Sequence, residues 1–321
     1  MSQGIPQAVL KVDNFVDVLR EQAVLNDGKR LYGFLTNGET LGESYTFDEL
    51  DARARSIAVR LQERNLEGER AILLYPSSLE YLAAFFGCLY AGVIAVPVYP
   101  PQMGKQLSRI DSIIKDCQPK VFMATADIFQ GIENNMPALM EAGAGKWMLT
   151  DTGDEPSASL WKRPNVNGDT ISFLQYTSGS TGTPKGVMVS HSNLLANQRS
   201  LSKLTQSHPD SVYVSWLPLF HDMGLIGTAL QPVFYGFASY QMAPFSFVQR
   251  PIRWLKAIAD YGATFSVSPN FGYDLCVSRI SDEEAANLDL SSWEMACNGA
   301  EPVRIETLNQ FSRKFAVSGF K

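Results

Sequence analysis

Between residues 176 and 186 the chain reads Tyr176-Thr177-Ser178-Gly179-Ser180-Thr181-Gly182-Thr183-Pro184-Lys185-Gly186, a run with three glycines, five Ser/Thr hydroxyls and one lysine. The apolar residues at 171–175 and at 187–189 are typical of strands, and 193–204 is typical of a helix. Glycine lets the backbone approach an anion closely, while main-chain N–H groups and hydroxyls donate hydrogen bonds and lysine neutralises charge. The sequence therefore predicts a phosphate-binding loop directly after a strand.

This loop departs from the Walker pattern, in which Gly-Lys-Ser/Thr follows a glycine and four further residues, because Pro184 precedes Lys185 and Gly186 follows it. By composition alone, a cluster of Ser, Thr and Gly indicates a flexible loop. The ordered string that closes on Thr-Pro-Lys-Gly nevertheless closely resembles the phosphate-binding signature of the adenylate-forming enzymes, which include acyl-CoA synthetases, peptide-synthetase adenylation domains and luciferases. The resemblance implies a catalytic role for Lys185. It also implies that the phosphates of ATP are bound by Thr177, Ser178, Gly179, Ser180, Thr181, Gly182 and Lys185.

Composition and charge argue against several classes of protein. Of the 321 residues, 45% are hydrophobic and 19% charged, as in an ordinary soluble globular protein. The net charge of −6 and the pI near 5.2 argue against a nucleic-acid-binding surface. The four cysteines lack CxxC spacing, which favours buried, reduced thiols over disulfides or metal ligands. Three histidines are too few for a histidine-rich metal site.

One uncharged stretch, residues 81–99, is long enough to span a bilayer. It contains two glycines and a proline, so a buried helix over 79–91 and a buried strand over 93–98 fit it better than one membrane helix. The first residues of the chain also lack the basic and apolar regions of a secretory signal. We therefore expect a cytoplasmic protein without an integral membrane span.

The chain alternates strand patterns with helical ones. Strands are expected at 71–75, 93–98, 121–124, 147–149, 212–216, 238–242, 264–267 and 295–298, and helices at 79–91, 105–116, 128–141, 250–261 and 303–314. Such alternation implies parallel sheets with helical crossovers. We predict an α/β fold of two βα-rich subdomains with mostly parallel sheets flanked by helices. The boundary is placed in the polar connection 151–169, giving residues 1–168 and 169–321, and the two subdomains can exchange elements.

A second motif follows the strand at 212–216 and reads Trp216-Leu217-Pro218-Leu219-Phe220-His221-Asp222-Met223-Gly224-Leu225. Taken alone, His221 could be a buried histidine satisfied by a neighbour, and Asp222 could be the N-cap of a helix over 223–229. The segment resembles the WxPxxHD motif of the adenylate-forming superfamily. That resemblance implies that His221 lies near the substrate carboxylate at the mouth of an acyl pocket, whereas we keep the capping role for Asp222.

A third motif, Ala296-Cys297-Asn298-Gly299-Ala300-Glu301-Pro302, joins a strand to a helix. The carboxyl ends of parallel strands are where α/β sheets place their ligands. Asn298 can donate and accept hydrogen bonds as an adenine edge requires, and Gly299 lets a flat ring approach the backbone. A plain strand-to-helix turn, with Pro302 at the first helical position, is compatible with this role. The stretch resembles the adenine-binding segment of the superfamily, which implies adenine contacts from Asn298, Gly299, Ala300 and Glu301.

Within the superfamily, the amino-acid sequence around the motifs is most similar to that of the fatty acyl-AMP ligases, notably at 216–227, 249–255, 268–276 and 288–293. Phe220 stands where that family usually has tyrosine. Aromatic residues are frequent between the second and third motifs, and such segments can line an apolar tunnel, although core packing accounts for most of them. The resemblance implies an acyl pocket that includes Phe220, Phe271 and Tyr273.

The resemblance implies an ATP-dependent ligase that converts a medium- or long-chain fatty acid to an acyl-adenylate and releases pyrophosphate. The acyl group would then pass to an acyl carrier protein or to a carrier domain of a polyketide or peptide synthase. Mg²⁺ is expected, held mainly by phosphates, with no metal ligand within the chain. The family's β-barrel subdomain and its C-terminal domain, which supplies a catalytic lysine, would follow Lys321, so the chain is expected to be an N-terminal part that alone is slow or inactive.

Three alternatives stay open from the sequence. The first two are an acyl-CoA synthetase and an amino-acid adenylation domain of the same superfamily. The third belongs to another class, a non-catalytic module that binds a nucleotide or an acyl chain. The presence of Lys185 and His221 argues against the third.

Overall fold

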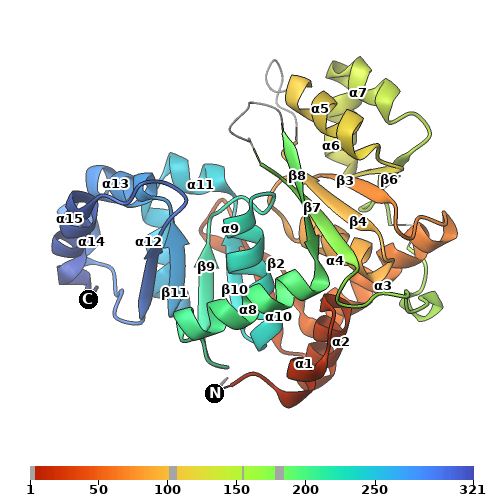
Figure 1. The fold of residues 1–321 in the computed structure, drawn as a ribbon. Coiled ribbons are helices and arrows are strands. Elements are labelled where there is room, and N and C mark those ends of the chain that lie inside the picture. Colours follow the sequence, from red (N-terminus) through yellow and green to blue (C-terminus); the bar gives the residue numbers. More distant parts are fainter. Residues whose placement is uncertain (1–3, 101–106, 154, 178–183) are drawn as a thin grey trace. The chain divides into compact units, whose positions relative to one another are not determined.

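The computed structural model describes residues 4–100, 107–153, 155–177 and 184–321. Its contacts divide the chain into two compact units (Figure 1). Unit 1 comprises Met1–Leu10, Gly28–Thr46 and Gln198–Lys321, and unit 2 comprises Lys11–Asp27 and Phe47–Asn197. Each unit is built around one six-stranded sheet in the described part of the chain, which confirms the α/β fold of mostly parallel sheets flanked by helices.

The sheet of unit 2 has the order β6-β5-β3-β4-β7-β8. Its strands are β3 (Arg70–Leu74), β4 (Ile94–Val98), β5 (Val121–Ala124), β6 (Trp147–Leu149), β7 (Ile171–Thr177) and β8 (Lys185–Ser190). The pairs from β6 to β7 are parallel, and β8 runs antiparallel to β7. Strands β3 and β5 are almost entirely buried, as expected for parallel strands covered on both faces.

The helices of unit 2 are α2 (Phe15–Leu25), α3 (Phe47–Glu63), α4 (Leu79–Tyr90), α5 (Leu107–Cys117), α6 (Ala126–Asn135), α7 (Pro137–Ala142) and the start of α8 (His191–Thr205). Of these, α4, α5 and the pair α6–α7 connect successive strands from β3 to β6. The uncharged run 81–99 is thus a helix followed by a strand, as predicted. Helix α4 begins where the Ser78 hydroxyl accepts the N–H of Tyr81, and it ends just before Gly92 with φ +67°. No helix in the described part of the chain reaches the length and hydropathy of a membrane span.

Two details of unit 2 differ from the sequence-based expectation. The single helix expected at 128–141 is interrupted, because Pro137 cannot donate to the preceding turn and instead begins α7. The connection 151–169 contains a 3₁₀ turn, η1 (Ala158–Leu160), and is fixed to the unit by side chains. There, the Trp161 indole donates to the carbonyl of Tyr90 at 2.7 Å.

The sheet of unit 1 has the order β12-β11-β9-β10-β1-β2. Its strands are β1 (Arg30–Thr36), β2 (Thr40–Thr46), β9 (Val212–Ser215), β10 (Ala238–Met242), β11 (Phe265–Ser268) and β12 (Met295–Asn298). Only β2 is antiparallel to its neighbour. The helical segments are α1 (Gln7–Lys11), α9 (Asp222–Gly224), the π-helical η2 (Leu225–Leu230), α10 (Gln231–Tyr235), α11 (Pro244–Gln249), α12 (Ile252–Tyr261), α13 (Asn270–Arg279), α14 (Asp282–Ala286), α15 (Ile305–Phe315) and η3 (Ala316–Ser318).

The division into units differs from the expected boundary between residues 168 and 169, because strands from each half complete the other sheet. The β1–β2 hairpin turns at Asn37–Gly38, where both residues have positive φ, and β1 pairs with β10 of the second half. The phosphate-loop strands β7 and β8 instead extend the sheet of unit 2, because β7 pairs with β4. The chain therefore passes between the units more than once, as the expected exchange of elements allows, and the last passage falls between Asn197 and Gln198 within helix α8.

Candidate active site

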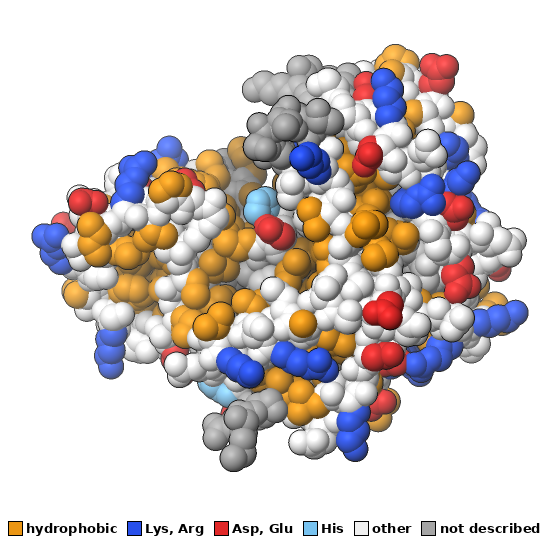
Figure 2. Space-filling view, in the orientation of Figure 1, with side chains coloured by type: hydrophobic (Ala, Val, Ile, Leu, Met, Phe, Trp, Pro, Cys, Tyr) orange, Lys and Arg blue, Asp and Glu red, His pale blue; other side chains and the backbone are white. Residues whose placement is uncertain are grey.

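The predicted phosphate loop connects β7 to β8 in unit 2. Thr177 pairs directly with Lys185 across the antiparallel ladder, and both residues are exposed. Ser178, Gly179, Ser180, Thr181 and Gly182 lie outside the described residues. Two apolar side chains of β8 are exposed, Val187 at 50% and Met188 at 68%, and Figure 2 shows hydrophobic side chains over this strand. The hairpin therefore brings one hydroxyl and one cation together where its two strands end.

The base of this hairpin is fixed to helix α5. The buried Tyr176 pairs with Gly186, where a Cβ atom would lie 2.9 Å from the tyrosine ring. The Tyr176 hydroxyl donates to the Asp116 carboxylate, and the Arg109 guanidinium donates to the Tyr176 carbonyl at 3.4 Å. Burial, together with the hydrogen bond to Asp116, raises the pKa of Tyr176 well above its usual range. Tyr176 thus stays un-ionised and supports the hairpin through packing and through its hydrogen bond to Asp116, rather than acting as an acid in catalysis.

His191 follows the hairpin at the start of α8 and is 1% exposed. Its Nδ1 atom accepts the backbone N–H of Phe15 at 3.1 Å. Burial lowers the pKa of His191 from an ordinary value near 6.5 to about 4, so the ring is neutral at pH 7. This histidine joins α2 to α8 and has a structural role.

The second motif places His221 and Asp222 together on unit 1, each with a side chain that is 55% exposed. The Nδ1 atom of His221 lies 2.6 Å from Asp222 Oδ1, a distance that requires a proton between them, so Nδ1–H donates to the carboxylate. The N–H of Met223 donates to the same carboxylate oxygen at 2.7 Å. The hydrogen bond to Asp222 is the main cause that raises the pKa of His221, and it lowers the pKa of Asp222 in turn.

The expectation that Asp222 is an N-cap residue is wrong, although its carboxylate does accept the N–H of the next residue, Met223. Helix α9 begins at Asp222, so His221 is the N-cap residue. The expected helix over 223–229 is also different, since only residues 222–224 are α-helical and η2 continues as a π-helix. His221 thus has an extended backbone conformation and lies between β9 and α9. Its ring is held in place by the contact with Asp222.

Aromatic residues surround the strand that leads to His221. Trp216 is buried and stacks on Phe247 with ring centroids 4.0 Å apart, and the ring of Phe271 meets its edge at 5.7 Å. Phe271 is 41% exposed, and Phe220 is half-buried. Two of the three expected acyl-pocket residues are therefore at least partly exposed.

Tyr273, the third of these residues, lies in the core of unit 1. It is 2% exposed, and its ring meets Trp254 and Phe311 edge to face. Its hydroxyl donates to the carbonyl of Cys297 in β12 at 2.7 Å. Burial raises the pKa of Tyr273. In this position Tyr273 holds the strand that leads to Asn298.

The third motif forms a turn at the carboxyl end of β12. Asn298 is partly buried, and a Cβ atom on Gly299 would meet nothing within 4 Å. Ala300 has a φ of +66°, a left-handed conformation that is uncommon for alanine. The Glu301 carboxylate accepts the N–H of Phe271 at 2.7 Å and so caps the start of α13. The turn therefore leaves open space beside Gly299 and uses Glu301 in a structural contact.

Asn270 is a residue that the motif analysis missed. It is 2% exposed and its Nδ2 donates to Asp274 Oδ2 at 3.1 Å and to Thr307 Oγ1 at 3.0 Å. Its Oδ1 accepts the backbone N–H of Arg304 at 3.0 Å and Nδ2 of Asn298 at 3.2 Å. The buried Oδ1 of Asn298 has no hydrogen-bond partner among the described residues. Two signals in the sequence pointed to it: it follows a strand and a proline at 265–269, and it lies in the stretch 268–276 that resembles the fatty acyl-AMP ligases.

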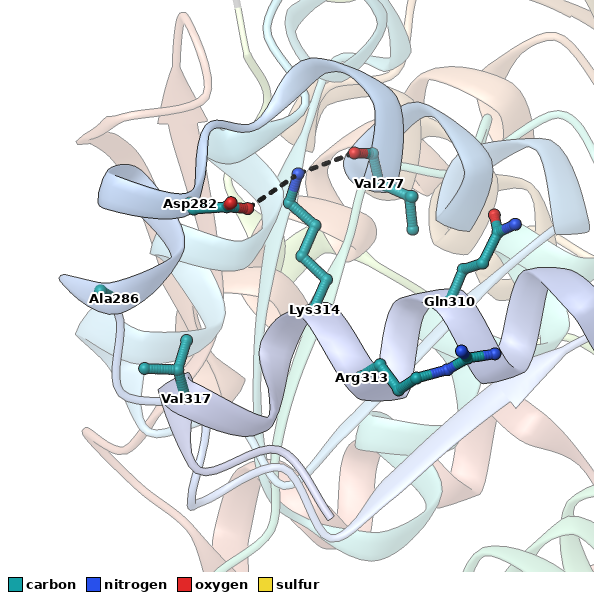
Figure 3. A pocket seen from close by; sticks show the side chains of 7 residues that line it. All are labelled: Val277, Asp282, Ala286, Gln310, Arg313, Lys314 and Val317. Atoms are coloured by element: carbon teal, nitrogen blue, oxygen red, sulfur yellow. Dashed lines mark hydrogen bonds and ion pairs between the residues drawn. The ribbon is translucent and has the colours of Figure 1, made fainter.

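A separate surface pocket of about 620 Å³ lies between α13, α14 and α15 (Figure 3). Lys314 crosses it and donates to the carbonyls of Val277 and Ile280, which cap the end of α13. None of the residues expected to bind substrate lines this pocket. Within the described ranges, no three His, Cys, Asp or Glu side chains gather as metal ligands.

Comparison with known proteins agrees with the motifs. A family model described as AMP-binding enzyme matches residues 20–319. The chain is 42% identical over 310 residues to the medium-chain-fatty-acid–[acyl-carrier-protein] ligase JamA of Moorena producens, a match that covers 95% of this chain and 52% of JamA. It is 35% identical over 297 residues to the long-chain-fatty-acid–AMP ligase FadD32 of Mycolicibacterium smegmatis, covering 91% and 47%. The chain thus spans about half the length of the curated relatives it matches.

A solved structure matches equally well. It is the fatty acyl-adenylate ligase from L. pneumophila in complex with acyl adenylate and pyrophosphate. The TM-score is 0.92 at 41% sequence identity, and the match covers 99% of this chain and 55% of that chain. The fold is therefore shared with a protein whose structure contains acyl adenylate and pyrophosphate.

Proposed function

This chain belongs to the AMP-binding enzyme family, and we propose that it is the nucleotide- and acyl-binding part of a fatty acyl-AMP ligase. The fatty acid, medium- or long-chain, would be activated with ATP. Support comes from the similarity to JamA, to FadD32 and to an acyl-adenylate ligase with its product bound. The observation that carries the proposal is the turn at Asn298, where an unpartnered acceptor and the open space beside Gly299 stand at the carboxyl end of a parallel strand.

The proposed reaction has two steps. A carboxylate oxygen of the fatty acid attacks the α-phosphorus of ATP, the bond from that phosphorus to the bridging oxygen breaks, and pyrophosphate leaves. The thiolate of a carrier-bound phosphopantetheine then attacks the acyl carbon and releases AMP. For the first step, the protein's contribution is to align the two anions and to neutralise their charge. Mg²⁺ would accompany the nucleotide, bound by its phosphates.

Each motif has a role in this proposal. Thr177, Lys185 and residues 178–182 would hold the phosphates, with Lys185 neutralising the charge that develops on them. Asn298, Gly299 and Ala300 would hold adenine, and the Glu301 carboxylate would keep the turn closed through the N–H of Phe271. Phe220 and Phe271 would line the start of the acyl pocket, and Tyr273 would support β12 from within the core.

The electrostatics of His221 fit a position beside the substrate carboxylate. Because Asp222 raises its pKa, His221 carries a proton to higher pH than an isolated histidine does. With Nδ1–H directed at Asp222, the Nε2–H of the protonated ring is left to donate to an anion. The same assignment leads us to propose a cytoplasmic enzyme whose partner is an acyl carrier protein or carrier domain.

The test is nucleotide binding by site variants of this chain. Asn298→Ala and His221→Ala should each weaken binding of a non-hydrolysable dodecanoyl-AMP analogue by about 5- to 150-fold, the value of one or two hydrogen bonds to a ligand. His208→Ala is the matched control, because His208 is an exposed histidine of unit 1 outside the motifs. Unchanged binding in both site variants would contradict the proposed site, provided that circular dichroism shows them folded.

A further inference from the structure

The hydrogen-bond network around Asn270 fixes the direction in which Asn298 presents its amide. Carboxylate oxygens accept hydrogen bonds and donate none, so the Asn270 group that faces Asp274 at 3.1 Å must be its NH₂. A backbone N–H donates only, so the group that faces Arg304 N at 3.0 Å must be the carbonyl oxygen. Both ends of the Asn270 amide are thereby assigned without ambiguity.

The orientation of the Asn270 amide in turn fixes the orientation of the Asn298 amide. The Oδ1 atom of Asn270 also faces Asn298 at 3.2 Å, so Asn298 must direct its NH₂ toward Asn270. The Oδ1 atom of Asn298 is then the end of its amide that Asn270 does not engage. That oxygen is buried and has no donor in the described part of the chain. A buried acceptor without a partner destabilises a fold, and in a native protein it calls for an explanation such as a ligand.

We infer that Asn270 is a positioning residue that makes Asn298 an acceptor only, and that this acceptor selects a purine with an amino group at C6. The inference rests on the proposed adenine site. A 6-amino group donates to Oδ1, whereas the 6-oxo group of hypoxanthine or guanine is itself an acceptor and opposes it. Because Asn298 cannot turn while Asn270 holds its NH₂, it cannot offer a donor to the wrong base.

The arrangement also accounts for residues outside the motif. Asp274 and Thr307 come from helices α13 and α15, and together they hold Asn270 in place. The pair Asn270–Asn298 thus connects the starts of two helices to the carboxyl end of β12. Selection of the base would depend on side chains that never touch it.

The test compares the dissociation constants of ATP and ITP by calorimetry. The wild-type chain should bind ATP at least about tenfold more tightly than ITP. The 6-amino group of ATP forms a hydrogen bond with Oδ1 of Asn298, whereas the 6-oxo group of ITP places a second acceptor against it. In Asn270→Leu the Asn298 amide is free to turn, so the ratio should fall below about threefold. Thr307→Val is the matched control, because it leaves both Oδ1 contacts and the Asp274 contact of Asn270, and its ratio should stay near the wild-type value.

A ratio unchanged in folded Asn270→Leu, even with weaker binding overall, would overturn the inference and leave Asn270 a structural residue. If that variant does not fold, purine riboside triphosphate, which has only hydrogen at C6, decides the matter on the wild-type chain. It should bind at least about fivefold more weakly than ATP and more tightly than ITP, and equal binding of all three would overturn the inference. No nucleotide binding by the folded wild type would instead overturn the proposed function and the inference together.

Discussion

Acid should destabilise unit 2 through His191. This ring is 1% exposed, its Nδ1 accepts the N–H of Phe15, and its pKa in the fold is lowered to about 4 by burial. In the unfolded chain the pKa returns to its ordinary value near 6.5. Between these two values the unfolded state binds the extra proton, so the free energy of unfolding falls as the pH falls. Above pH 6.5 the contribution is fully present.

The magnitude follows from the interval between the two pKa values. A tenfold change in proton binding is worth about 1.4 kcal/mol, so the loss is about 2 kcal/mol at pH 5 and about 3 kcal/mol at pH 4. That is a large part of the 5–15 kcal/mol by which a typical domain is stable. His191→Gln keeps an oxygen that can accept the Phe15 N–H and has no group that titrates in this range.

Urea unfolding of the wild type and His191→Gln at pH 7, 6 and 5 measures the effect. The variant should be the less stable protein at pH 7, and the difference between the two should shrink by about 2 kcal/mol at pH 5. His208→Gln serves as the control, since His208 is 41% exposed. Parallel loss of stability in wild type and His191→Gln would show that the buried ring is not the source of the acid sensitivity.

Three further predictions concern the supports of the site. Gly186→Ala should destabilise unit 2 by about 1–3 kcal/mol, because its Cβ would lie 2.9 Å from the ring of Tyr176; a fully stable variant in thermal unfolding would contradict this packing. Lys314→Met should lower the free energy of unfolding by about 1–3 kcal/mol, because the cap of α13 is lost. Asp282→Ala should lower it by under about 0.5 kcal/mol, because the Asp282 side chain is 99% exposed and its Oδ1 lies 3.8 Å from Lys314 Nζ. Equal losses in the two variants would refute the capping role. NMR titration of the imidazole should give His221 a higher pKa than His221 in Asp222→Asn, and equal values would rule out the proton shared with Asp222.

Much of the fold was predictable because its signals are local. The alternation of apolar strands and helices gave the parallel sheets, and glycine and proline within 81–99 marked the change from α4 to β4. The sequence of Asn37-Gly38 is also a hairpin signal, yet the β1–β2 hairpin was not expected. Its partner β10 lies about two hundred residues further on, and no local pattern specifies a parallel pairing over that distance.

The site was predictable to the extent that it is a set of linear motifs. Residues 176–186, 216–225 and 296–302 pointed to the family that the comparison confirms. Asn270 was missed because only Asp274 is a local partner. The other three partners, Asn298, Arg304 and Thr307, are 28, 34 and 37 residues further along the chain, and only folding brings them to Asn270. Tyr273 and Glu301 show the converse, since both stand in or near a motif and both are engaged in internal hydrogen bonds.

The central proposal, an adenylate site adjoining a pocket for a fatty acyl chain, is tested most directly by calorimetric titration of this chain with two non-hydrolysable acyl-AMP analogues, dodecanoyl and acetyl. Each additional buried methylene is worth about 0.8 kcal/mol, so even a few of the ten extra carbons in contact with the protein should strengthen binding of the long chain by more than about tenfold. Preference of that size would support the fatty acyl-AMP ligase. Equal affinities would contradict the fatty-acid assignment while retaining the adenylate site, and no binding of either analogue by the folded chain would contradict both.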